Sequence, residues 1–150
     1  MLHAMTSAQD EFRRFLRDFV SPAMRSAGLK GSAGHYQLPS QSCFALIAFQ
    51  KSKYSTAITV EFTINLKAVS RQIWDRARAD MTWLPKIPTA NSTHPVAGWS
   101  VRIGNLMPGT QDHWWSLRSG QPLDQLAVEV IGTLNDYGLP ALRSAVAQAA

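Results

Sequence analysis

Hydrophobic and polar residues alternate strictly from Ile58 to Lys67, in the stretch ITVEFTINLK. A period of two is typical of a β-strand with one face on the core and the other toward water or a ligand. The apolar set is Ile58, Val60, Phe62, Ile64 and Leu66, and the polar set is Thr59, Glu61, Thr63, Asn65 and Lys67. We therefore predict a strand over 58–67 whose even-numbered side chains are buried.

The N-terminal segment has the spacing of an amphipathic helix instead. Thr6 and Gln9 match a capping box, which predicts where this helix begins. Pro22 interrupts the pattern, so either the helix kinks there or Ser21 caps a second short helix. Gly28 fits a left-handed cap at the end. Apolar residues recur at the intervals of three and four that one buried stripe requires: Phe12, Phe15, Leu16, Phe19, Val20, Ala23, Met24 and Ala27.

The rest of the chain predicts shorter elements. Apolar runs and alternation indicate strands at 36–38, 43–49 and 98–103, with a hairpin connection at 54–56. Helical spacing indicates helices at 70–81 and 122–137. Gly138 fits a left-handed cap at the end of the second helix, and a short helix is predicted from Pro140. Three prolines predict a loop over 83–98.

This order of elements predicts an α+β fold. Adjacent strands joined by short links favour an antiparallel sheet, here of about four strands, with the helices packed on one face. A length of 150 residues indicates a single globular domain over 1–150, in which we expect residues 1–5 to be a disordered tail.

Composition narrows the classes of function. The net charge of +5 and the pI near 9.8 raise nucleic acid or an acidic protein as partners, although acidic residues accompany most of the basic ones. The single cysteine, Cys43, excludes an internal disulfide and favours a cytoplasmic protein. No apolar run is long enough to predict a membrane span, and no spacing of ligands predicts a metal or cofactor site. Catalytic motifs are also missing, so we do not favour an enzyme.

Ordered short motifs make the chain similar to a known family. It resembles the bacterial domain of unknown function 4304 family. The matching pieces run along nearly the whole chain: 12–29 with Pro22 and Gly28-Leu29, Phe49-Gln50-Lys51-Ser52, Ile64-Asn65-Leu66, Arg102-Ile103, Asp112-His113-Trp114-Trp115 and Gly138-Leu139-Pro140. The resemblance implies one compact domain and brings no activity or catalytic residues with it.

The polar face of the 58–67 strand is a candidate binding site. Glu61, Thr63 and Asn65 share that face, and Arg102 lies on the outward side of the 98–103 strand. If Gln50 points the same way, its strand adds Phe44, Leu46 and Ala48, which would make a half-apolar groove for a ligand or peptide. The alternative is that the loop over 83–98 folds across this face.

The stretch Asp112-His113-Trp114-Trp115 completes the candidate site. Neighbouring side chains on an extended segment point apart, so we expect one tryptophan in the core and the other at the rim, with its N–H on a polar partner. Asp112 instead caps the first turn of a helix if one begins at His113. The alternative to a binding hot spot is that neighbouring loops cover both tryptophan rings.

These observations favour a small bacterial cytoplasmic domain that binds a protein or a small ligand. An immunity or adaptor protein of a toxin or defence system is one concrete version, and the positive charge then requires an acidic partner. The first alternative is nucleic-acid binding through Arg13, Arg17, Lys51 and Lys53 with an exposed tryptophan. The second is an enzyme of unknown class with its site around Glu61, Asn65 and Arg102. The oligomeric state stays open.

Overall fold

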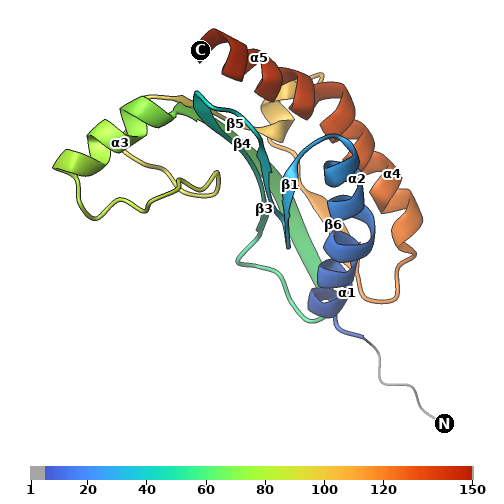
Figure 1. The fold of residues 1–150 in the computed structure, drawn as a ribbon. Helices are drawn as coiled ribbons and strands as arrows, with labels where there is room; N and C mark the ends of the chain where they lie inside the picture. The colour runs from blue at the N-terminus through green and yellow to red at the C-terminus, as the bar shows by residue number, and fades with distance from the viewer. Residues whose placement is uncertain (1–5, 150) are drawn as a thin grey trace.

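The computed structural model describes residues 6–149, and in this range six strands form one antiparallel sheet (Figure 1). The strands are β1 (Lys30–Ser32), β2 (His35–Leu38), β3 (Cys43–Lys51), β4 (Thr59–Ser70), β5 (Trp99–Arg102) and β6 (Trp115–Arg118). The order is β1-β2-β3-β4, and β5 and β6 both pair with β4, at 65–68 and 59–62 respectively. The α+β class and the antiparallel sheet are confirmed, with the short strands β1 and β6 as additions.

Helices cover both faces of this sheet, so the prediction that all of them pack on one face was wrong. One face carries α1 (Ala8–Phe15), α2 (Ser21–Ser26), α4 (Leu123–Thr133) and α5 (Leu139–Ala149), while α3 (Arg71–Asp80) and the loop after it lie on the other side (Figure 1). Two π-helical turns, η1 (Leu16–Val20) and η3 (Leu134–Gly138), join α1 to α2 and α4 to α5. A 3-10 turn, η2 (Ile103–Leu106), follows β5 directly.

The main core lies between the first face and the terminal helices. Phe62 is at its centre, with ring centroids 5.0 Å from Phe12, 5.8 Å from Phe15, 5.9 Å from Phe49 and 5.6 Å from Trp115. Val60, Phe62, Ile64 and Leu66 are fully buried, as their alternation predicts. Ile58 is the exception: it precedes β4 and is 69% exposed, so burial of that position was wrong.

The first helix begins one residue later than its sequence pattern predicts. Ser7, not Thr6, is the N-cap, and its side chain accepts a hydrogen bond from the Asp10 N–H. Gln9 does not close a capping box, because its side chain bonds Lys51 and the Thr56 carbonyl. The capping box was therefore wrong, although the helix that it introduced is present.

Pro22 is accommodated by a wide turn in a continuous helical path. The Ser21 N–H bonds the Leu16 carbonyl, five residues back, and Pro22 then lies in the first turn of α2, where its missing N–H is tolerated. The Ser21 side chain caps nothing and hydrogen-bonds the Tyr36 hydroxyl at 2.7 Å instead. Gly28 has the predicted left-handed conformation, with a φ of +93°.

Gly138 does not end its helix. It lies inside η3 without a positive φ, and the chain continues directly into α5, so the predicted left-handed cap was wrong. A Cβ at this position would lie 3.2 Å from side-chain atoms of both Ile103 and Leu134. We infer that glycine is needed here for close packing of the helix against η2.

A second, smaller core lies on the opposite face of the sheet. Phe44, Leu46, Ala48 and Val69 pack there against Trp74 of α3 and against the loop. The predicted helix at 70–81 is confirmed, with Ser70 as its N-cap. The half-apolar strand face is thus covered.

Two expectations concern the ends of the chain and the membrane. The predicted disordered tail, residues 1–5, lies outside the described residues. Between residues 6 and 149, none of the helices has the length and apolar character needed to cross a membrane.

Candidate functional site

Five of the eight predicted site residues meet in one hydrogen-bonded network on the second face of the sheet. Asn65 Nδ2 donates to Gln50 Oε1 at 2.7 Å, and Arg102 Nε donates to Asn65 Oδ1 at 3.1 Å. Arg102 Nη1 lies 3.3 Å from Asp112 Oδ2, which also accepts the Trp114 Nε1–H at 2.9 Å. Alternation along β4 and β5 brings Asn65 opposite Arg102, as the pattern implied.

The network also pins the loop over 83–98 to the sheet. Asn91 Oδ1 accepts from Asn65 Nδ2 at 2.9 Å, and Asn91 Nδ2 donates to the Phe49 carbonyl at 3.1 Å. The Lys67 ammonium donates to the Ser92 carbonyl at 2.6 Å. Asn65 and Lys67 are consequently only 9% and 8% exposed. The prediction of an open polar face was therefore wrong. The loop over 83–98 folds across this face, which is the alternative that the sequence left open.

Thr63 and Glu61 lie outside the network, for different reasons. Thr63 is fully buried and donates its hydroxyl hydrogen bond to the His113 carbonyl at 2.7 Å, so it fixes the chain before β6. Glu61 is exposed and pairs with Ser116 of β6 through the sheet register. Neither side chain hydrogen-bonds a member of the network, so the structure does not bring these two predicted site residues into it.

The tryptophan pair has the unequal exposure that its extended backbone predicts. Trp115 is 6% exposed and stacks on Phe62 in the main core, with the His113 ring edge-on at 4.6 Å. Trp114 is half-buried at the rim, where the Arg102 guanidinium lies 5.3 Å from its ring centroid. Asp112 caps no helix, because Trp115 begins β6; its carboxylate orients Arg102 and Trp114 instead.

A polar hollow of about 260 Å³ lies over this network. Gln50, Asn65 and Arg102 line it together with loop residues from Ala90 to Thr93. The Asn65 side chain donates to Gln50 and Asn91 and accepts a hydrogen bond from Arg102. The network therefore holds the loop in place without a ligand.

A larger hollow of about 720 Å³ lies next to it, and we call this the arginine groove. It runs between the N-terminal helix, the tip of the β1–β2 hairpin and the end of β3. Its floor is apolar, from Phe12, Leu16 and Phe49, and no Asp or Glu of residues 6–149 lines it. The cationic lining residues are Arg13, Arg17, Arg25 and Lys51, with His35 nearby. Gln50 and Asn91 line both hollows, so the two adjoin.

The cations of the arginine groove differ in how far they are neutralised. Arg13 pairs with Asp10, and Arg17 lies 2.9 Å from Asp18, so each has a carboxylate on its own helix. Hydrogen bonds from Ser7 and then from Arg13 lower the pKa of Asp10, and the bond from Arg17 lowers that of Asp18.

The other two groove cations bond only to uncharged groups in the described part of the chain. Arg25 donates to the Gly31 carbonyl, and Lys51 donates to the Gln9 side-chain oxygen. Neither takes part in an ion pair among residues 6–149. Arg25 and Lys51 are therefore the cations most available to an anionic ligand.

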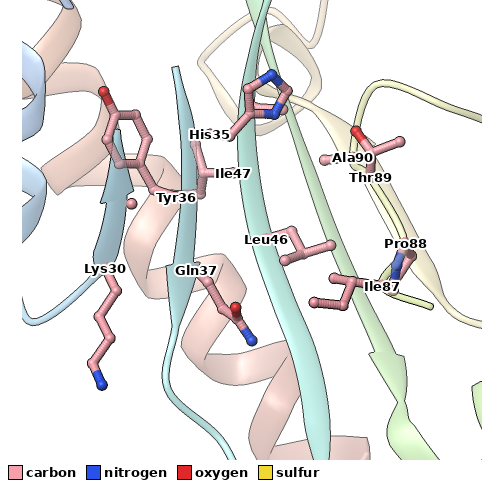
Figure 2. Close-up of a pocket in the computed structure, with 12 residues that line it drawn as sticks. Lys30, His35, Tyr36, Gln37, Leu46, Ile47, Ile87, Pro88, Thr89 and Ala90 are labelled. Carbon is pink, nitrogen blue, oxygen red and sulfur yellow. The ribbon is translucent and has the colours of Figure 1, made fainter. Parts of the chain in front are cut away.

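A third pocket, of about 260 Å³, opens where the loop passes over β2 and β3. Figure 2 shows Leu46 of β3 and Ile87 of the loop pointing toward one another across it, with Gln37 and Lys30 on the neighbouring strands. Ile87 remains 51% exposed. The loop therefore leaves a gap here instead of packing closely on the sheet.

Sequence reasoning missed Asn91, Arg25 and His35 as lining residues. Asn91 lies in a segment without periodicity, so no pattern places its side chain. Arg25 had a usable signal, because Arg13, Arg17 and Arg25 are spaced by four and eight residues and share a helix face. Among residues 6–149, no group of three or more His, Cys, Asp or Glu side chains is placed to hold a metal ion.

The fold and these hollows define a small α+β domain with polar and cationic surfaces around one sheet. A family model described as "Domain of unknown function (DUF4304)" matches residues 20–144, and the chain belongs to this family. The resemblance drawn from the sequence is thus confirmed. No curated protein and no solved structure matched the chain.

Proposed function

We propose that this domain binds a protein partner by holding an acidic, extended segment of it in the arginine groove. The observation that carries the proposal is a hollow of about 720 Å³ with a cationic rim and an apolar floor. No Asp or Glu side chain of residues 6–149 lines this hollow. That volume falls in the range of roughly 300–1,000 Å³ typical of ligand sites. Carboxylates of the segment would pair with Arg25 and Lys51, and apolar side chains would cover the floor.

The end of β3 supports an extended conformation for the bound segment. Phe49 donates its N–H to Gly34 on the β2 side at 2.8 Å, and Ser52 donates its N–H to Glu61 on the β4 side at 2.7 Å. Main-chain groups point to alternate sides of a strand, so Lys51 turns its N–H and C=O toward the side where β2 has already ended. An added strand can pair with these groups, as in other complexes formed by strand addition.

Aromatic exposure favours a protein segment over single-stranded nucleic acid. Binding of unpaired bases relies on aromatic rings that lie open for stacking. The rings in the arginine groove, Phe12 and Phe49, are only 4% and 6% exposed. Arg13 of α1 and Arg17 of η1 are also paired with carboxylates, which weakens their attraction to a phosphate backbone.

The setting of this activity belongs to the same proposal. A bacterial cytoplasmic protein, with the role of an immunity or adaptor protein in a toxin or defence system, fits a binding domain of this size. The one cysteine, Cys43, is free and buried, which suits a reducing compartment. The basic charge then calls for an acidic partner.

Fluorescence anisotropy tests the proposal directly. Three labelled probes are titrated at low and at physiological salt: a short peptide that alternates glutamate with valine, its lysine–valine counterpart, and a single-stranded oligonucleotide. We expect the acidic peptide to bind best. The double variant Arg25→Ala, Lys51→Ala should weaken its binding at least ~10-fold, or about 1.4 kcal/mol, because both free cations are lost.

The matched control is the double variant Arg76→Ala, Lys86→Ala. Both residues are exposed and outside the arginine groove, so the same net charge is removed without touching the proposed site. Equal losses in the two double variants would mean a diffuse charge effect and would overturn the proposal. Tighter binding of the oligonucleotide, with a steep dependence on salt, would establish the nucleic-acid alternative instead.

A further inference from the structure

A separate small pocket lies on the second face of the sheet, under the later part of the loop over 83–98. Its volume is about 150 Å³, and it shares no lining residue with the arginine groove. Lys67 of β4 and His94 of the loop line it, with Trp74, Trp99, Thr93 and Ser100 around them. The Trp99 ring packs on the main core, on the other face of the sheet. The pocket therefore combines two nitrogen bases, the Trp74 indole ring and two hydroxyl groups in a small volume.

Lys67 brings a positive charge into this pocket without a counter-ion. The side chain belongs to a residue that is 8% exposed, and burial lowers the pKa of its ammonium group. Its hydrogen bond in the described chain goes to the Ser92 carbonyl, while an ammonium has three donors. The ion pairs of residues 6–149 do not include Lys67, and no carboxylate lines the pocket. A buried cation of this kind is stabilised by an anion.

His94 adds a second unsatisfied group to the same pocket. Its ring packs edge-on against Trp74, with centroids 5.0 Å apart, and its Nε2 atom is buried with no hydrogen-bond partner in the described chain. Burial, and after it the charge of Lys67, lowers the pKa of the imidazole. Buried polar groups are nearly always paired, so an unpaired one beside a cavity indicates a missing partner.

We propose that this pocket binds a small organic carboxylate. The carboxylate accepts hydrogen bonds from the Lys67 ammonium and from His94 Nε2–H, and the short apolar part of the ligand lies against Trp74 and Val96. Charge-assisted bonds of this type are stronger than those between neutral groups. The volume of about 150 Å³ is well below that of drug-sized sites and restricts the ligand to a few heavy atoms.

The test titrates the protein with sodium acetate, sodium butanoate or inorganic phosphate at constant ionic strength. Tryptophan fluorescence reports on Trp74, and NMR signals of the His94 ring report on Nε2. We expect saturable binding of butanoate with a dissociation constant of about 1 mM or below. Acetate should bind more weakly, because it leaves the Trp74 ring uncovered.

Two variants separate binding from damage to the fold. Lys67→Met should weaken butanoate binding at least ~10-fold, while Lys53→Met, which removes an equal charge from an exposed position outside both the pocket and the arginine groove, should leave it unchanged. Lys67→Met also removes the contact to Ser92, so His94→Phe is the second variant: it keeps that contact and the packing on Trp74 and should still weaken binding.

Three results would overturn the assignment. The first is no saturable response to either carboxylate at concentrations well above the expected constant. The second is equal binding by wild type, Lys67→Met and His94→Phe. The third is saturation by phosphate without any response to carboxylates, which would make the pocket a phosphate site. None of these results affects the acidic-peptide assay, so the two proposals fail independently.

Discussion

Phe62 and Thr63 are neighbours on β4, and both are fully buried, but on opposite faces of the sheet. Phe62→Ala should lower the free energy of unfolding by about 3–5 kcal/mol, because a cavity opens among four aromatic rings. Thr63→Ala should cost less, about 1–3 kcal/mol, because it leaves the His113 carbonyl without its donor. Urea denaturation measures both losses, and exposed Glu61→Ala serves as the control. A Thr63→Ala loss no larger than that of Glu61→Ala would contradict the buried hydrogen bond.

Trp114 and Trp115 should respond differently to the same substitution. Trp115→Ala removes a ring that stacks on Phe62 and should cost about 3–5 kcal/mol of stability. Trp114→Ala removes a half-buried ring at the rim and should cost clearly less. Acrylamide should quench the emission of Trp114 more than that of Trp115, measured by difference from the single Trp→Phe variants. Similar quenching of both rings would contradict the assignment.

The alternation of single residues made much of the candidate site predictable. Asn65 and Arg102 could be assigned to one face because the period of two determines where each side chain on a strand points. Asn91 could not be placed, since its position depends on long-range contacts to Asn65 and Phe49 and not on any local pattern. The exposure of Ile58 was also unpredictable from alternation, because the pattern continues one residue beyond the strand.

The loop over 83–98 is held by a few contacts, and Asn91 makes two of them. Asn91→Ala should therefore speed hydrogen exchange in residues 88–93, because local opening becomes easier. Ser92→Ala is the matched control: Lys67 bonds the Ser92 main chain, which that variant retains. Mass spectrometry of exchanged peptides measures the effect. Equal exchange in both variants would show that other contacts hold the loop.

How well each strand, helix or loop could be predicted depended on how strong its local sequence pattern was. Three prolines predicted a loop over 83–98, but a loop has no periodicity from which its path can be inferred. β1 was missed because its sequence, KGS, has no apolar residue and is exposed throughout. β6 does alternate, with Trp115 and Leu117 buried, but this signal was not recognised. Gly138 was misread because a glycine required for close packing has the same sequence signature as a left-handed cap.

For the whole molecule, the lowered pKa values of His94, Asp10 and Asp18 all make the folded state less stable as the pH falls. His94 has a pKa below 6.5, and Asp10 and Asp18 have pKa values below 3.8. As the pH falls through each of these values, the unfolded chain takes up the proton before the folded chain does. The stability from His94 is thus complete above pH 6.5 and is lost as the pH falls through the folded-state pKa.

His94→Phe should remove this mildly acidic pH dependence. Urea denaturation of the wild type should show lower stability at about pH 5.5 than at about pH 7.5, and the variant should show a smaller difference. His35→Gln, which changes an exposed histidine, serves as the control and should behave like the wild type. A His94→Phe protein with the full wild-type pH dependence would contradict the link to this residue.

The two π-helical turns also mark where the length of this chain can change during evolution. Each turn contains an extra residue, and in η1 it keeps Leu16, Val20 and Met24 on the core although four α-helical residues overshoot one turn by about 40°. Deleting one residue, such as Asp18, would turn this segment into a regular α-helix, in which Val20 and Met24 follow Leu16 at the intervals of one buried stripe and stay on the core. We therefore expect some family members to lack one residue here, and the exposed connection over 52–58 can accept insertions.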